Sequence, residues 1–169
     1  LEAFRKFIKA IPENSGMAYI FVQHLHPGYE SSLPEILQRV TQIPVVEISD
    51  NVHVDPDHIY VIPSNKILVA SDGVLRLSPR LTKVKVLPIN IFVSSLAEVH
   101  QAHAIGVVLS GTGADGTEGL KDIKNHGGIT FAQDPVSASY NAMPQNAIDS
   151  KIVDFILPSE NIPGKLIEL

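Results

Sequence analysis

The sequence predicts an α/β protein with a doubly wound, mostly parallel sheet and helices on both faces. Short uncharged runs rich in Val and Ile alternate along the chain with segments whose apolar residues recur at helical spacing. The short runs are continuously apolar, as strands are when helices cover both faces of a sheet. A length of 169 residues suits one domain, which we expect to span residues 1–169.

The predicted elements follow one another with short connections. A helix begins at Leu1, a strand covers 17–22, and Ser32 could cap a helix running to about 42. Four β-branched runs between 45 and 86 predict an antiparallel excursion, with a hairpin turn at Asp72-Gly73. The remaining elements alternate, which favours right-handed crossovers and a parallel sheet. They are a helix at 89–103, a strand at 106–109, a helix at 118–125, a strand at 128–132, a short helix within 137–150, a strand at 152–156 and a helix at 162–169.

Composition excludes several classes of function. The net charge is −5 and the basic residues are scattered, which argues against a nucleic-acid partner. There is no cysteine, so disulfides, thiolate metal sites and a cysteine nucleophile are excluded. No apolar run approaches the roughly 18 residues of a membrane helix, so we expect no membrane insertion.

A glycine-rich loop between a strand and a helix is the strongest local signal, and two interpretations compete for it. Gly111, Gly113 and Gly116 have the spacing of a dinucleotide-binding loop. Asp115, however, would place a carboxylate where a pyrophosphate should bind. The alternative is that the loop presents Asp115 as the acidic member of a catalytic set.

Two histidines follow the strand at 17–22. The pair His24-x-His26 resembles a metal-binding pair, but the other ligands are not evident, so we expect no metal. In a parallel sheet, His24 and Asp115 would both lie at the carboxyl edge, and such a pair is the orienting half of a nucleophilic triad. No G-x-S-x-G turn occurs in the chain, and Ser110 is better interpreted as a hydroxyl bound to local backbone.

Three motifs together resemble a known family. They are Q-H-x-x-P-G-Y at 23–29, L-S-G-T-G-A-D-G at 109–116 and A-S-Y-N-A-M-P at 138–144. Their order and spacing are similar to those of the catalytic domain of the CheB-type protein-glutamate methylesterases of bacterial chemotaxis. The resemblance covers essentially the whole chain, including D-H-I-Y-V-I-P at 57–63.

The resemblance implies a Ser-His-Asp triad that hydrolyses glutamyl methyl esters on chemoreceptors and releases methanol, without a cofactor. It assigns His24 and Asp115 to the triad and the backbone N–H of Thr112 to the oxyanion hole. The family usually has Met in place of Thr112. Met143 matches a loop that borders the family's site. The resemblance also implies a cytoplasmic protein, to which a receiver or methyltransferase domain is often attached.

The serine of the family lies in a G-x-S-x-G-G turn between the first strand and the first helix. Because a helix begins at Leu1, we expect residues 1–169 to lack that first strand and the nucleophile turn. The expectation is an esterase whose serine lies upstream of Leu1, with the 169 residues inactive alone. The segment V-L-P-I-N-I-F at 86–92 also departs from the family pattern. The alternative is a non-catalytic regulatory or binding module.

Overall fold

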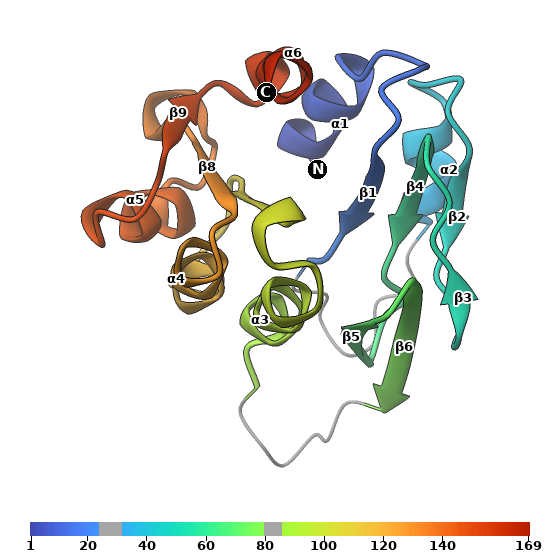
Figure 1. Ribbon diagram of the computed structural model, residues 1–169. Coiled ribbons are helices and arrows are strands. Elements are labelled where there is room, and N and C mark those ends of the chain that lie inside the picture. The colour runs from blue at the N-terminus through green and yellow to red at the C-terminus, as the bar shows by residue number, and fades with distance from the viewer. Residues whose placement is uncertain (24–31, 80–85) are drawn as a thin grey trace.

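The structure is a computed structural model that describes residues 1–23, 32–79 and 86–169. Two parallel three-stranded sheets lie next to each other between layers of helices (Figure 1). The first has the order β1-β4-β2, with β1 at Ala18–Phe21, β4 at His58–Val61 and β2 at Val45–Glu47. The second has the order β7-β8-β9, with β7 at Ile105–Val108, β8 at Ile129–Gln133 and β9 at Phe155–Leu157. The predicted class is confirmed, although the described strands form two half-sheets instead of one sheet.

A small antiparallel sheet lies beside them. It has the order β3-β6-β5, with β3 at Val52–His53, β6 at Val74–Pro79 and β5 at Lys66–Ser71. The predicted turn at Asp72-Gly73 joins β5 to β6, and Gly73 has a φ of 69°. The prediction that all of 45–86 is antiparallel is wrong, because β2 and β4 pair in parallel within the first half-sheet. A β-branched run shows that a strand forms, but not which distant strand it pairs with.

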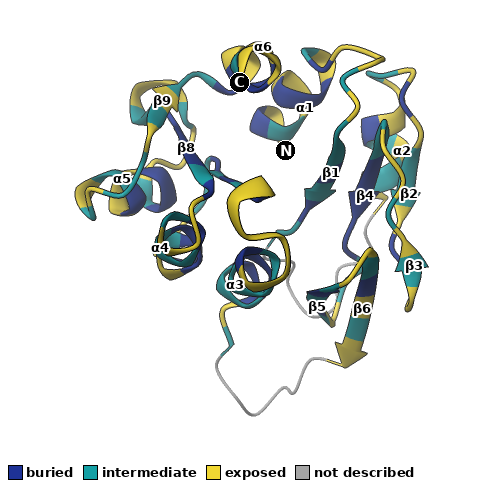
Figure 2. Ribbon diagram, in the orientation of Figure 1, coloured by how far each residue is buried: buried dark blue, intermediate teal, exposed yellow. Residues whose placement is uncertain are grey.

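Helices cover both faces of the half-sheets, and Figure 2 shows that their buried sides turn inward. One apolar cluster gathers α1 (Glu2–Lys9), α2 (Leu33–Gln38) and α6 (Ile162–Glu168). The other gathers α3 (Pro88–His100), α4 (Thr117–Asn125) and α5 (Ala142–Asp149). Three short 3₁₀ turns complete the described elements: η1 at Gln101–His103, η2 at Pro135–Ser137 and η3 at Ser159–Asn161.

Helix α2 ends four residues earlier than predicted, because its last side chain bonds to the chain that follows. Gln38 Nε2 donates to the carbonyls of Thr41 (3.1 Å) and Ile43 (3.0 Å), and Gln38 Oε1 accepts from Val45 N (2.8 Å). These bonds turn the backbone out of the helix and into β2. Ser32 occupies the position before the helix but makes no side-chain cap, contrary to the prediction.

Candidate active site

Asp115 is the buried carboxylate of the glycine-rich loop that follows β7, with 2% of its surface exposed. Its Oδ2 accepts from Ile89 N (3.0 Å) and its Oδ1 from Asn90 N (2.7 Å), in the first turn of α3. Backbone N–H groups at a helix N-terminus stabilise a negative charge. The loop therefore holds the Asp115 carboxylate at a fixed position near the carboxyl edge of β7.

Asn90, whose N–H binds Asp115, also uses its side chain to bind the chain beyond Asp115. Its Oδ1 accepts from Gly116 N (2.8 Å) and Gly119 N (2.9 Å), at the start of α4. The loop before α4 thus supplies the side chain that accepts from the free N–H groups of α3, and α3 supplies the side chain that accepts from those at the start of α4. Sequence reasoning missed Asn90, although Pro88 at the start of a helix with a polar residue two positions later was a usable signal.

This arrangement removes the dinucleotide interpretation of the loop. A phosphate cradle needs free N–H groups at the start of the helix, and those of Gly116 and Gly119 are bound to Asn90. Gly116 has a φ of 107°, and a Cβ there would lie 2.9 Å from a methyl group of Val108. The glycine allows the chain to turn tightly from Asp115 into α4.

The tip of β7 is tied to the loop before α5. Ser110 Oγ donates to the carbonyl of Tyr140 (3.2 Å) and accepts from Tyr140 N (2.9 Å). Gly111 N donates to the same carbonyl (2.9 Å), and the carbonyl of Gly111 accepts from Met143 N (3.1 Å). The Ser110 hydroxyl therefore binds backbone, but that of Tyr140, thirty positions away, and not the local backbone that its sequence context favoured. Gln133, missed from the sequence, also fixes Ser110, since its Oε1 accepts from Ser110 N (2.8 Å).

The other predicted site residues lie around this tip. Thr112 and Gly113 are exposed, and the carbonyl of Gly113 accepts from Asn146 Nδ2 (3.0 Å). Met143 is 7% exposed and packs where a side chain on Gly111 would stand. His24 lies outside the described residues.

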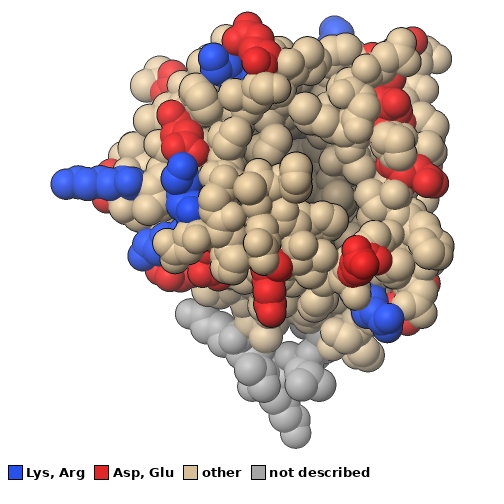
Figure 3. All heavy atoms as spheres, in the orientation of Figure 1, with Lys and Arg blue, Asp and Glu red and all other residues tan. Residues whose placement is uncertain are grey.

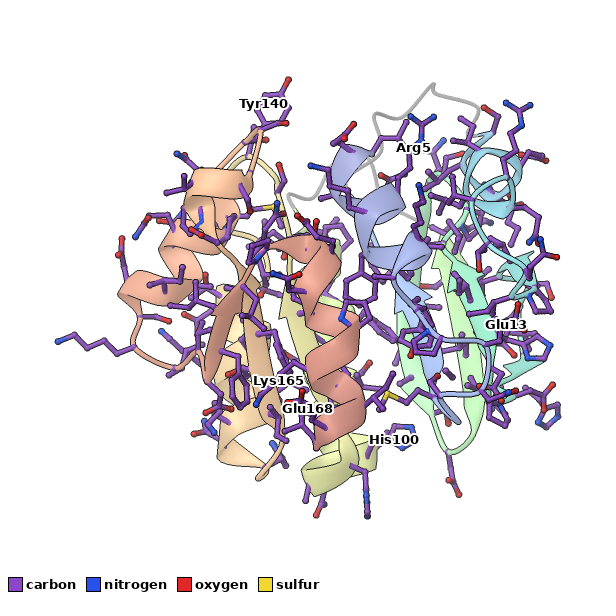
Figure 4. The ribbon with its side chains drawn as sticks, turned by 90° about the horizontal axis from the view of Figure 1, so that it is seen from above. Arg5, Glu13, His100, Tyr140, Lys165 and Glu168 are labelled. Atoms are coloured by element: carbon purple, nitrogen blue, oxygen red, sulfur yellow. The ribbon has the colours of Figure 1, made fainter. Side chains whose placement is uncertain are left out.

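A cavity of about 630 Å³ separates the two half-sheets. Both β1 and β7 line it along their whole length, and Gln23, Thr112, Tyr140 and Met143 line it beyond the carboxyl ends of the strands. Figure 3 shows a hollow with uncharged walls in the middle of one face, with the charged side chains nearer its edges. In Figure 4, Tyr140 points outward from the molecule at the end of its loop.

A second carboxylate, Asp154, lies just before β9 and has a different environment. Its Oδ1 and Oδ2 accept from Lys124 Nζ (2.9 and 3.0 Å), and Oδ2 also accepts from Thr130 N (3.0 Å). Burial alone would raise the pKa of Asp154, but hydrogen bonds from Lys124 and Thr130 and the charge of Lys124 together lower this pKa. The Thr130 hydroxyl also donates to the carbonyl of Ile152 (2.6 Å), so side chains hold a segment predicted as strand, and β9 begins only at Phe155.

Among the described residues, no helix combines the length and the apolar character needed to cross a bilayer. The fold and the loop together define a class of protein. It is a parallel α/β domain that holds an acidic residue in a fixed position at the carboxyl edge of a half-sheet.

Comparisons with known proteins give this class a family. A family model described as CheB methylesterase matches residues 1–166. The crystal structure of the Thermotoga maritima CheB methylesterase catalytic domain superimposes with a TM-score of 0.88 at 29% identity, covering 99% of this chain and 91% of that one. The chain belongs to the CheB methylesterase family.

The chain is also similar to curated proteins, two of which carry the methylesterase name. A protein-glutamate methylesterase/protein-glutamine glutaminase from Thermotoga maritima is 32% identical over 168 residues, or 96% of this chain and 48% of that protein. A putative one from Leptospira interrogans is 29% identical over 171 residues, or 100% of this chain and 89% of that protein. An uncharacterized 104.1 kDa protein from Rhodobacter capsulatus is 38% identical over 130 residues, or 77% of this chain and 14% of that protein. The chain thus spans half or less of the first and last of these three relatives, and most of the second.

Proposed function

We propose that this chain forms most of an esterase domain that hydrolyses glutamyl methyl esters on chemoreceptors, in the cytoplasm. The observation that carries the proposal is the fixed Asp115 carboxylate at the tip of β7, in a chain that belongs to this family over residues 1–166. An acid in this position would orient the catalytic histidine and stabilise its protonated form.

The proposed chemistry uses one residue that the 169 residues do not contain. A serine upstream of Leu1 attacks the ester carbonyl carbon, and His24 takes the hydroxyl proton and returns it to the departing methoxide, which leaves as methanol. Water then hydrolyses the acyl-enzyme with His24 as the base, which restores the glutamate side chain. Asp115 orients His24 throughout.

An oxyanion donor is needed while the carbonyl oxygen carries negative charge. We assign this role to the backbone N–H of Thr112. Gly111 N cannot serve, because it already donates to the carbonyl of Tyr140. A main-chain donor does not depend on the side chain, so Thr in place of the family's Met leaves the donor intact and changes only the wall beside it.

We also propose that the domain binds the receptor next to the tip of β7 and that a further domain is attached to it in the same polypeptide. The exposed Tyr140 (63% exposed) stands beside the tip of β7, where its backbone binds Ser110, and would meet a protein substrate there. Val136 (94% exposed), in η2, adds a second exposed apolar side chain a few residues earlier in the chain. The Thermotoga relative is about twice the length that this chain covers, which suits a receiver or methyltransferase domain in the same polypeptide.

Methanol release from methylated receptor tests the function. The full polypeptide should release methanol, and the 169-residue chain alone should be slower by about 10⁶-fold, the loss measured when a serine protease loses its nucleophile. Replacing the upstream serine by alanine in the full polypeptide is the matched control and should give the same loss.

Equal release from the 169-residue chain and the full polypeptide would contradict the serine assignment. Receptor binding without any methanol release from the full polypeptide would instead favour a regulatory binding module.

A further inference from the structure

The segment after β7 carries the proposed oxyanion donor and has glycine on both sides of it. Thr112 lies between Gly111 and Gly113, and Gly113 has a φ of 81°. Glycine has more conformational freedom to lose on folding than any other residue, so this segment does not hold one conformation by itself. An oxyanion donor is effective only when it is already in place as the charge develops. The fold must therefore supply contacts that fix the peptide group of Thr112.

The start of α5 fixes the direction of the Thr112 N–H. The carbonyl of Gly111 accepts from Met143 N (3.1 Å), in the first turn of α5. The peptide between Gly111 and Thr112 is trans, so its carbonyl and its N–H point in opposite directions. Because the carbonyl points at α5, the N–H of Thr112 points away from this helix. Thr112 itself lines the cavity between the half-sheets.

Ser110 holds the same segment on the side of β7. Its hydroxyl donates to the carbonyl of Tyr140 (3.2 Å) and accepts from Tyr140 N (2.9 Å). Gly111 N donates to that carbonyl as well (2.9 Å). A Cβ on Gly111 would overlap the sulfur of Met143, so only glycine lets the backbone come this close to α5. The end of β7 is thus tied to the chain that leads into α5.

Asn146 holds the segment on the other side of Thr112. It lies in the second turn of α5, and its Nδ2 donates to the carbonyl of Gly113 (3.0 Å). The helix in turn contacts β7, β8 and α4, and Figure 1 shows it beside β8. A group held by a packed helix is placed more precisely than one held by a loop. Thr112 therefore lies between two contacts that both lead to α5.

We propose that Ser110 and Asn146 are positioning residues, which hold the N–H of Thr112 toward the carbonyl oxygen of the reacting ester. The inference rests on the proposed function, because Thr112 serves as an oxyanion donor only in that reaction. Each of the two side chains acts through a bond to the backbone near Thr112 and not through contact with the substrate. A displacement of about 1 Å at a reacting centre can cost about 10²-fold in rate.

Both side chains can be changed without unfolding the domain. Asn146 is exposed and Ser110 is half-buried, and their side-chain hydrogen bonds lie at the surface. Substitutions at such positions usually change the free energy of unfolding little. A merely structural role would therefore leave kcat unchanged, whereas a positioning role lowers it.

Steady-state methanol release from methylated receptor by the full polypeptide tests the inference. Asn146→Ala should lower kcat by about tenfold and leave KM within about twofold, because it weakens an interaction made in the transition state and not substrate binding. Ser110→Ala should lower kcat by at least as much, since two bonds to Tyr140 are lost. Removing an oxyanion donor altogether costs about 10²–10³-fold, so a displaced donor should cost less.

Gln145→Ala is the matched control for Asn146→Ala. Gln145 is the neighbouring exposed residue of α5, and its Nε2 donates to Asp149 Oδ1 (2.8 Å) within the same helix. Its loss should leave kcat within about twofold of wild type. Ser110→Thr keeps the hydroxyl and Asn146→Gln keeps the amide, so both variants should recover most of the rate that the alanine variants lose.

A receptor peptide with a boronic acid in place of the methyl ester gives a second measurement. Boron adds to a serine oxygen, and the tetrahedral adduct places an oxygen where the oxyanion would stand. Asn146→Ala and Ser110→Ala should weaken binding of this transition-state analogue by about tenfold, the same factor by which kcat falls. Binding of the peptide with an unesterified glutamate should not change.

Two results would overturn the inference while the wild-type polypeptide releases methanol. One is a wild-type kcat in either alanine variant. The other is an equal loss of kcat in Asn146→Ala and Gln145→Ala, which would mean that the bond to Gly113 has no special role. If the wild-type polypeptide releases no methanol, the esterase proposal fails and the inference fails with it.

Discussion

Two carboxylates of the same half-sheet are held in different ways. Asp115 lies in the loop that follows β7, and Asp154 lies just before β9. Asp115 accepts from two backbone N–H groups at the start of α3. Asp154 is bound by the ammonium group of Lys124 and by Thr130, and its pKa is lowered. Helix amides fix a carboxylate without adding a full positive charge beside it, which leaves an acid able to orient a histidine. At Asp154, the ion pair with Lys124 instead holds the segment before β9 against β8.

The largest effect that separates the two sites should come from Asp115→Asn in the full polypeptide. We expect methanol release to fall by about 10⁴-fold, the loss seen when the triad acid of a serine protease becomes an amide. Asp154→Asn is the matched control, because it makes the same chemical change in the same half-sheet and should leave the rate within about twofold. Similar losses of activity from both variants would contradict the distinction.

Asp154 should act on stability instead. Asp154→Ala should lower the free energy of unfolding at pH 7 by about 2 kcal/mol, because hydrogen bonds to charged groups are lost. Since the folded-state pKa of Asp154 is below its ordinary value of 3.8, this contribution is fully present above that value and disappears as pH falls through the folded pKa.

Urea unfolding of wild type and Asp154→Ala from pH 7 to pH 3 measures this dependence. The two curves should stay apart down to about pH 4 and converge below it. Curves that keep the same separation from pH 7 to pH 3 would mean that folding does not lower the pKa of Asp154.

The smallest of these effects should come from Asn90→Ala, which removes the acceptor for Gly116 N and Gly119 N. Loss of a helix cap costs about 1 kcal/mol, or about 2–4 °C in melting temperature for a domain of this size. Asn90→Asp keeps the acceptor oxygen and should lose less. If Asn90→Ala melts at the wild-type temperature, the paired capping of α3 and α4 is not stabilising.

Local sequence patterns were sufficient for most elements of the fold. Continuous apolar runs predicted β1 and β7, and helical spacing predicted α1, α3 and α4 within a few residues. The end of α2 and the start of β9 were not predicted, because each depends on side chains that bond to backbone elsewhere. The pairing of β2 with β4 was not predicted either, since partner choice is made between segments far apart in the chain.

In the candidate site, too, local patterns were predictable and contacts between distant residues were not. The glycine spacing and Asp115 marked the loop, and the order of strands indicated the edge on which it lies. Asn90, Gln133 and Tyr140 were missed as supports, because each acts through a hydrogen bond to a residue more than twenty positions away. The roles of His24 and Thr112 remain predictions from the resemblance.

The hairpin of β5 and β6 has a consequence for the order of folding. Its six residue pairs are closed by the two-residue turn at Asp72-Gly73, whereas β1 must find β4 across a long connection. Hairpins form in about 1–10 μs, so this one should be in place well before the parallel strands meet. Ser95 of α3 then has a ready surface, since its hydroxyl accepts from Ala70 N (2.8 Å) at the hairpin. The hairpin would therefore form first and α3 would pack on it next. Asp115 would bind the start of α3 only after that.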